Sequence, residues 1–133
     1  MNFIKQSLII MGIITFIGSL FGCQAQNAKF QSLSVDEFEK CISDTSVVRL
    51  DVRTAGEYAN GHIPNAVNID VLQFNFKSKA LAQLSKDKTI AVYCRSGKRS
   101  KRAAGILANN GFTVVDLNNG YIGWTEAGQK TTK

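Results

Sequence analysis

The chain has 133 residues, of which 44% are apolar, and this is enough for one domain with a single hydrophobic core. Its formal net charge of +6 permits nucleic acid or an anionic surface as a partner. A dense group of cations lies at residues 95–102, but no aromatic residues alternate with them as a stacking platform for bases requires. Length therefore argues against several domains, and the charge pattern disfavours nucleic-acid binding.

Residues 1–22 have the pattern of a secretory signal peptide. A basic start with Lys5 precedes an uncharged apolar run over residues 8–22. This run is shorter than the roughly 20 residues that a membrane-spanning helix needs. The alternative is an uncleaved membrane anchor. We expect residues 23–29 to be a polar tether, residues 30–129 the folded domain and residues 130–133 a polar tail.

Residues 20–23, Leu-Phe-Gly-Cys, resemble a bacterial lipobox, in which the chain is cut before the cysteine and the cysteine is lipidated. Cys23 is then the lipidation site. The competing cut follows Ala25 and would release a soluble protein. Both interpretations predict an exported, periplasmic protein that meets the membrane only through its signal or a lipid anchor on Cys23.

The residues after the tether begin with a short strand pattern at 30–33. Ser34 and Glu37 form a capping box, which predicts a helix that runs to about Ile42. The helical spacing places Cys41 on the buried face, as a small core residue. The alternative is a resolving partner for Cys94, for which the sequence offers no support.

A buried strand pattern at residues 47–52 ends beside charged residues. Thr54 caps a short helix after this strand. Carboxylates at strand ends beside arginines usually form ion pairs that fix loops, so we expect this role for Asp51 and Glu57. We expect Arg53 to brace the loop that carries Cys94.

His62, the only histidine, lies in a turn before Pro64 and is expected to have a structural role.

Further patterns predict strands at 65–69, 89–93 and 113–116, and helices at 77–84 and 101–110. Leu81 and Leu84 are expected to face inward. Three small residues, Ala103, Ala104 and Gly105, are expected to bring their helix close to the sheet. Trp124 anchors a last helical turn, and the alternation predicts a three-layer α/β domain with a central, mostly parallel sheet flanked by helices.

Cys94 follows the strand at 89–93 and precedes a helix, at the sheet edge where α/β proteins bind ligands. Free N–H groups at the start of that helix favour an anion. Arg95, Lys98 and Arg99 add cations at a helix end that is already positive. We therefore expect a Cys94 thiol held partly as thiolate, which is the nucleophilic form.

Two outer cations, Lys101 and Arg102, are expected to be a solvated helix end. A cysteine phosphatase is the nearest enzymatic alternative, because its loop has a cysteine, five residues and an arginine. Here Arg99 comes one place too early for that pattern. A loop shortened by one residue is too tight for phosphate but can close around one sulfur atom.

Four segments, at 50–57, 61–69, 94–100 and 119–124, resemble in their order the signatures of the rhodanese (thiosulfate sulfurtransferase) family. The resemblance runs from about residue 33 to about residue 127. Asn119 stands where the family has the first of two glycines, and asparagine tolerates a left-handed backbone. Residues 94–100 resemble the active-site loop of that family.

The resemblance implies a rhodanese-like fold and a transfer of sulfane sulfur in two steps. Cys94 takes sulfur from thiosulfate or a similar small anionic donor, forms a persulfide and passes the sulfur to a thiophilic acceptor such as cyanide or a thiol. It implies no cofactor and no metal, and we expect a monomer. A non-catalytic persulfide carrier for a partner protein remains the alternative. The expected substrate-binding residues are Arg95, Ser96, Gly97, Lys98, Arg99 and Ser100.

Overall fold

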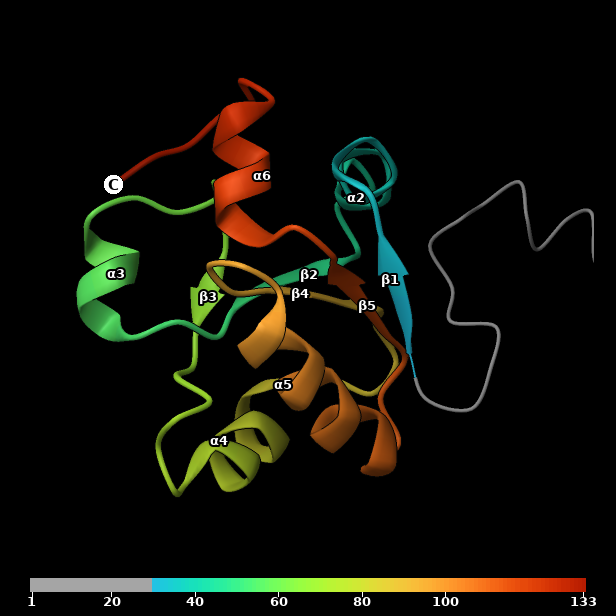
Figure 1. Ribbon diagram of the computed structural model, residues 1–133. Helices are drawn as coiled ribbons and strands as arrows, with labels where there is room; N and C mark the ends of the chain where they lie inside the picture. The colour runs from blue at the N-terminus through green and yellow to red at the C-terminus, as the bar shows by residue number, and fades with distance from the viewer. Residues whose placement is uncertain (1–29) are drawn as a thin grey trace, which may run out of the picture.

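The computed structural model describes residues 30–133, which form a five-stranded parallel sheet between layers of helices (Figure 1). The strand order is β1-β5-β4-β2-β3, and every pair of neighbouring strands is parallel. This confirms the expected three-layer α/β domain. The strands are β1 (Gln31–Leu33), β2 (Val48–Asp51), β3 (Val67–Asn68), β4 (Ile90–Tyr93) and β5 (Val114–Leu117). The helices are α2 (Val35–Ile42), α3 (Ala55–Ala59), α4 (Phe76–Gln83), α5 (Lys98–Asn109) and α6 (Gly120–Glu126).

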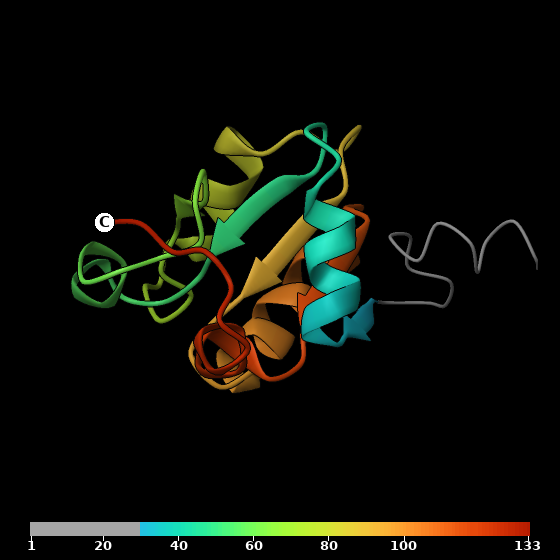
Figure 2. The same cartoon turned by 90° about the horizontal axis from the view of Figure 1, so that it is seen from above.

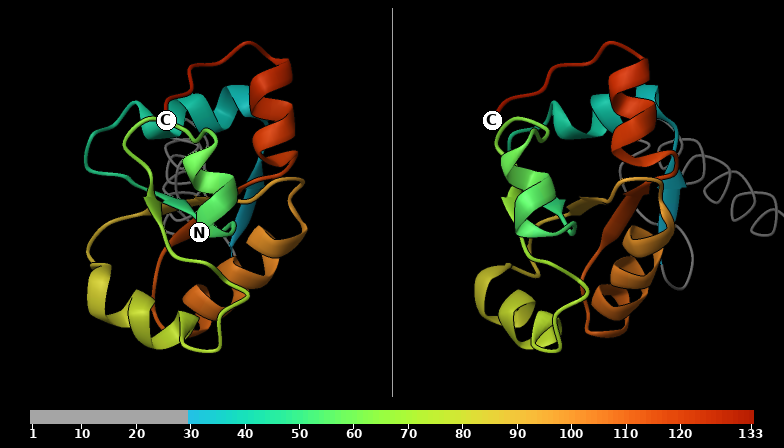
Figure 3. Two further views of the ribbon diagram at one scale, coloured as in Figure 1. Left: turned by 90° about the vertical axis from the view of Figure 1, so that its left-hand side faces the viewer. Right: turned by 60° about the vertical axis from the view of Figure 1, so that its left-hand side comes forward.

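The helices α2 and α6 cover one face of the sheet, and α4 and α5 cover the other (Figures 1 and 3). Seen from above, β2 and β4 run in the same direction beneath α2 and α6 (Figure 2). The central strand β4 is buried along its whole length. Ile90 and Val92 belong to the core on the α4 and α5 side, whereas Ala91 and Tyr93 belong to the core on the other side. This accounts for the unbroken apolar run in the sequence.

Capping boxes begin helices α2 and α3. The Ser34 hydroxyl accepts from the Glu37 N–H at 3.2 Å, and the Glu37 carboxylate accepts from the Ser34 N–H at 2.9 Å. Thr54 and Glu57 make the equivalent pair at the start of α3. Each pair satisfies backbone N–H groups that have no partner within the helix. The capping box predicted for α2 is confirmed, as is the cap of Thr54.

Helix α5 begins three residues earlier than the sequence predicts. Gly97, with φ of 103°, is its N-cap and turns the chain into the helix. Glycine adopts this left-handed backbone without the steric cost that a Cβ brings. Lys98, Arg99 and Ser100 therefore lie in the first turn of the helix rather than in the loop before it.

Two expectations about packing were wrong. Leu81 is 41% exposed, because α4 directs Phe76 and Ala80, which are four residues apart, toward the core. Gly105 does not bring α5 close to the sheet, because a Cβ at this position would meet open space. The neighbouring Ala103 and Ala104 are fully buried and make the close approach.

The end of the described chain is tied to the domain. The N–H and C=O groups of Thr132 pair with those of His62, both at 2.9 Å. Among residues 30–133, no helix combines the length and apolar character needed to cross a membrane. The predicted signal peptide, the tether and the predicted lipidation at Cys23 lie outside the described residues.

Candidate active site

Cys94 directly follows β4 and is 1% exposed, at the base of the loop that leads into α5. Its side chain is a free thiol. The Gly97 N–H donates to the sulfur at 3.1 Å, and the Ser100 Oγ lies 3.5 Å from it. The loop therefore curls around one sulfur atom, with the first turn of α5 closing the curl. The Gly97 N–H can stabilise negative charge that develops on this sulfur.

The connection between β5 and α6 holds this loop from outside. The Tyr121 N–H donates to the Cys94 carbonyl at 2.8 Å, and the Ile122 N–H donates to the Arg95 carbonyl at 3.1 Å. A Cβ on Gly97 would overlap the Asn118 carbonyl oxygen. A Cβ on Gly120 would overlap the backbone of Arg95. The close contact of the two segments thus depends on glycine at both positions.

The left-handed residue in this connection is Gly120, with φ of 63°. Asn119 has φ of −94°, so the reason given for tolerating asparagine at this position was wrong. Asn119 precedes α6 in a backbone conformation that any residue adopts. The substitution of the first family glycine by asparagine is therefore compatible with the turn.

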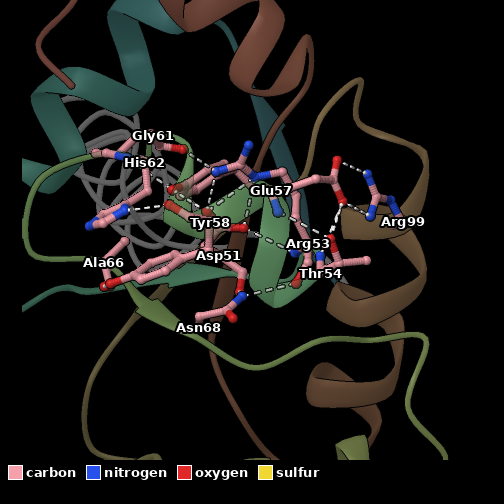
Figure 4. Close-up of polar contacts among 12 residues, drawn as sticks. Asp51, Arg53, Thr54, Glu57, Tyr58, Gly61, His62, Ala66, Asn68 and Arg99 are labelled. Atoms are coloured by element: carbon pink, nitrogen blue, oxygen red, sulfur yellow. Dashed lines mark hydrogen bonds and ion pairs between the residues drawn. The ribbon is translucent and has the colours of Figure 1, made fainter. Parts of the chain in front are cut away.

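The cations of the loop differ in their surroundings. Arg95 and Lys98 are exposed, as is Ser96. Arg99 is half-buried and forms a bidentate ion pair with Glu57, at 2.8 and 2.9 Å (Figure 4). Hydrogen bonds from Arg99 are the main cause that lowers the pKa of Glu57 from 4.5 to about 2. The same contact raises the pKa of the Arg99 guanidinium.

Asp51, Arg53 and Tyr93 form a buried network at the carboxyl ends of β2 and β4. Figure 4 shows Asp51 and Arg53 of this network. Arg53 pairs with Asp51 at 2.7 Å, and the Tyr93 hydroxyl donates to the same carboxylate at 2.6 Å. Burial alone lowers the pKa of Arg53, but hydrogen bonding and charge from Asp51 outweigh it and raise the pKa. Burial, followed by the charge of Asp51, raises the pKa of Tyr93.

Arg53 reaches the Cys94 loop only indirectly. Its guanidinium lies 4.3 Å from the ring centre of Tyr121 and donates to the Gly61 carbonyl at 2.7 Å. Tyr121 in turn bonds the backbone of Cys94. Arg53 therefore supports the loop by stacking on the ring of Tyr121, whose N–H bonds the loop backbone, rather than by contacting the loop directly.

His62 lies away from the thiol and makes structural contacts. Its ring stacks on Tyr58 with centroids 3.7 Å apart. Its Nδ1 donates to the Tyr58 carbonyl at 2.8 Å, which fixes the ring in the turn after α3. Cys41 packs in the core on the α2 and α6 side of the sheet, whereas Cys94 belongs to the core on the α4 and α5 side.

Comparison with known proteins assigns the family. Residues 34–127 match the family described as the rhodanese-like domain. The chain belongs to this family. The match begins at the N-cap of α2 and ends just after α6, so it includes the Cys94 loop and the turn at Gly120.

Relatives of this rhodanese-like domain include proteins named for different activities. It is 34% identical to a sulfurtransferase of Allochromatium vinosum over 65% of this chain and 80% of that protein. It is 36% identical to a tRNA uridine(34) hydroxylase of Buchnera aphidicola over 67% of this chain. The chain covers only 30% of the length of that hydroxylase. A rhodanese-related protein from Thermoplasma volcanium has a TM-score of 0.68 and 31% identity, with 77% of this chain and 98% of that one covered.

A pocket of about 320 Å³ flanks the active-site loop of the rhodanese-like domain. Its walls come from α3, from Arg95 and from α6, so it borders the loop that carries Cys94. The lining residues are Arg53, Glu57, Asn60, Gly61, Arg95, Tyr121, Ile122 and Thr125. Within residues 30–133, no three His, Cys, Asp or Glu side chains gather where they could hold a metal ion.

Sequence reasoning missed Asp116, which lies fully buried on β5. Ser100 donates to its Oδ1, and Lys101 pairs with its Oδ2 at 3.1 Å. The expectation that Lys101 is a solvated cation was incomplete, because its ammonium pairs with this carboxylate although its side chain is 40% exposed, whereas Arg102 is exposed as expected. A carboxylate in an otherwise apolar strand was the signal that could have identified this partner.

Proposed function

We propose that this rhodanese-like domain is a sulfurtransferase that carries sulfane sulfur on Cys94. The main support is the environment of the thiol, because the Gly97 N–H donates to a sulfur that lies just before the start of α5. The relative named a sulfurtransferase, which this chain matches over 80% of its length, supports the same chemistry.

The proposed reaction has two displacement steps. The Cys94 thiolate attacks the outer sulfur of thiosulfate, the sulfur–sulfur bond of thiosulfate breaks, and sulfite leaves with the electron pair. Cyanide or a thiolate then attacks the outer sulfur of the persulfide and releases Cys94 as thiolate. No oxidant or reductant is consumed when cyanide is the acceptor.

The exposed cations near the thiol would capture the donor. Arg95 and Lys98 have their charges at the surface, where they attract a dianion from solution and offset charge on the leaving sulfite. Arg99 is held by Glu57, so its positive charge is fixed beside the loop but partly compensated. We propose that the pocket beside Arg95 admits the sulfur acceptor.

We also propose that the chain is exported, on the basis of the basic start, the apolar run over residues 8–22 and the Gly22-Cys23 junction. Cleavage before Cys23 would allow lipidation, and cleavage after Ala25 would release the domain. In both cases the transferase would act outside the cytoplasm.

Sulfite release from thiosulfate in the presence of cyanide, with thiocyanate measured in parallel, tests the proposed activity. We expect both products to form catalytically with the wild type and neither to form with Cys94→Ser, whose side chain is similar in size. Loading of sulfur without turnover to cyanide or small thiols would instead favour a persulfide carrier. Full activity in Cys94→Ser would refute the proposal.

A further inference from the structure

A buried chain of polar groups leads from the Cys94 sulfur to the surface. Asp116 has no exposed surface, and its Oδ1 accepts from the Ser100 hydroxyl. The Ser100 oxygen is also 3.5 Å from Sγ of Cys94. On the far side, Oδ2 of Asp116 accepts from the Ser32 hydroxyl at 2.9 Å and pairs with Nζ of Lys101 at 3.1 Å. The Lys101 side chain is 40% exposed, so the chain of groups ends at solvent.

The number of protons in this chain fixes the direction of each hydrogen bond. A hydroxyl has one proton, and an ionised carboxylate can only accept. The Ser100 hydroxyl has two acceptors within reach, the Asp116 carboxylate and the Gly97 carbonyl at 3.2 Å, and its one proton goes to the nearer, charged carboxylate. A lone pair of Ser100 then faces the sulfur, and the Cys94 thiol donates its proton to Ser100. The resting arrangement therefore suits a neutral thiol. A thiolate in the same place would face that lone pair unless the proton of Ser100 moved.

We propose that Asp116 accepts the Cys94 proton through Ser100 when the sulfur attacks its donor, and returns it when the persulfide is discharged. This inference rests on the proposed sulfur transfer. The S–H bond breaks and an O–H bond forms on Ser100, while the original Ser100 proton passes to Asp116. Sulfur keeps the electron pair that attacks the donor, and Asp116 becomes a neutral carboxylic acid. In the second step the same two transfers run backward to the released Cys94 sulfur.

The charges around the chain are compatible with this transfer. A free thiol is a much weaker acid than a carboxylic acid, so the proton moves as the sulfur–sulfur bond forms rather than beforehand. One negative charge moves from Asp116 to sulfur, where the Gly97 N–H already donates. Lys101 from α5 is the charged group that faces Asp116, while β1 contributes Ser32 and β4 contributes the apolar Val92.

Arg99 of α5 adds a positive charge near Cys94, and Glu57 of α3 compensates it. Neither group touches the relay, so their pairing stays intact during the transfer. Ser100 is the catalytic member of the relay because it touches the reacting sulfur. Asp116 is a positioning residue that acts through Ser100.

The test is the rate of Cys94 alkylation by iodoacetamide from acid to alkaline pH, with sulfur loading from thiosulfate measured on the same proteins. Asp116→Asn keeps the size and the acceptor for Ser100 but removes the base. We expect it to slow both reactions roughly 10- to 100-fold at neutral pH. The deficit should shrink as pH rises, because hydroxide then replaces the missing base.

Variants of Ser100 test the relay without altering the buried carboxylate. Ser100→Ala should reproduce the loss and its pH dependence, and Ser100→Thr, which restores a hydroxyl, should recover most of the rate. Ser78→Ala is the control, because it removes a serine hydroxyl of α4 that bonds the Asn75 carbonyl outside the relay and should keep the wild-type pH profile. If Asp116→Asn does not fold, the Ser100 pair decides the question.

A wild-type pH profile in Ser100→Ala, or a loss in Asp116→Asn that is the same at every pH, would overturn the relay. Alkylation uses no sulfur donor, so it separates this inference from the proposed function. Absence of sulfur loading in the wild type, together with altered alkylation profiles in the variants, would reject the transferase and leave the relay standing.

Discussion

The Arg99 side chain places a positive charge near Cys94 and links two helices. Arg99 lies in the first turn of α5, shortly after Cys94 in the chain. Its ion pair with Glu57 connects α5 to α3. The side chains are about one quarter exposed, at 24% and 26%, so water screens the pair only in part. At the scale of single residues, this ion pair positions the cation and links two signature segments that are far apart in the sequence.

Replacing Glu57 with Gln should reveal the ion pair through its pH dependence. Glutamine still accepts the Thr54 N–H, so the capping box of α3 stays and only the charge is lost. The pKa of Glu57 is lowered to about 2, so its stabilisation is complete above the ordinary value of 4.5 and is lost as pH falls toward 2. We expect the free energy of unfolding to fall by about 0.5–1 kcal/mol at neutral pH.

Urea unfolding at a series of pH values measures this difference. The gap between the wild type and Glu57→Gln should stay constant down to mildly acid pH and then close toward strongly acid pH. Glu37→Gln, in the capping box of α2, is the matched control. A gap that does not change with pH would show that the charge of Glu57 adds nothing to stability.

The Cys94 loop and the connection between β5 and α6 depend on each other. Gly120 is left-handed and packs against the Arg95 backbone, while Gly97 packs against Asn118. Two hydrogen bonds from the start of α6 hold the carbonyl groups of Cys94 and Arg95. The loop geometry around the thiol is therefore set by a segment more than twenty residues later in the sequence.

Gly120→Ala should destabilise the domain and loosen the loop. The left-handed backbone alone costs about 1–2 kcal/mol for a residue with a Cβ, and the overlap with Arg95 adds to this. Thermal or urea unfolding gives the loss in stability, and sulfur loading on Cys94 should fall with it.

Gly105→Ala is the control for this glycine, because it lies within α5 and its Cβ would meet open space. Alanine is the better helix former, so this variant should be more stable by about 0.5–1 kcal/mol. Equal stability of Gly120→Ala and the wild type would contradict the account of the interlocked turn.

The sequence predicted some of these elements correctly and missed the start of α5. The strand β4 is apolar throughout, β2 and β5 combine apolar residues with charged ones, and capping boxes mark the starts of α2 and α3, so these elements were recognised. The start of α5 was missed because the left-handed Gly97 replaces the polar side chain that usually caps a helix. Asp116 was missed because its partners, Ser32, Ser100 and Lys101, approach only in the folded chain.

At the scale of the whole molecule, the parallel order of the sheet creates the candidate site. The carboxyl ends of β2, β4 and β5 meet at one edge, which brings Asp51, Cys94 and Asp116 to the same end of the sheet. The order of the four signature segments predicted the fold correctly. It gave no information about side-chain pairs such as Arg99 with Glu57, which join segments through space.

Export is a prediction about the whole chain. Expression in a bacterial host followed by intact-mass measurement of the membrane and soluble fractions should show a protein cut before Cys23, carrying lipid, or cut after Ala25. Cys23→Ala should prevent the lipidated form and leave the other cut available. A protein that still begins at Met1 in both fractions would contradict export by cleavage.

If Cys94 carries the transferred sulfur, intact-mass measurement should detect the added sulfur on the protein itself. After incubation with thiosulfate or glutathione persulfide, the wild type should gain the mass of one sulfur atom, which peptide mapping should locate on Cys94. Cyanide should remove this mass and release thiocyanate, and Cys94→Ser should gain none. The account is contradicted if Cys94→Ser gains the same mass, or if the wild type gains none from either donor.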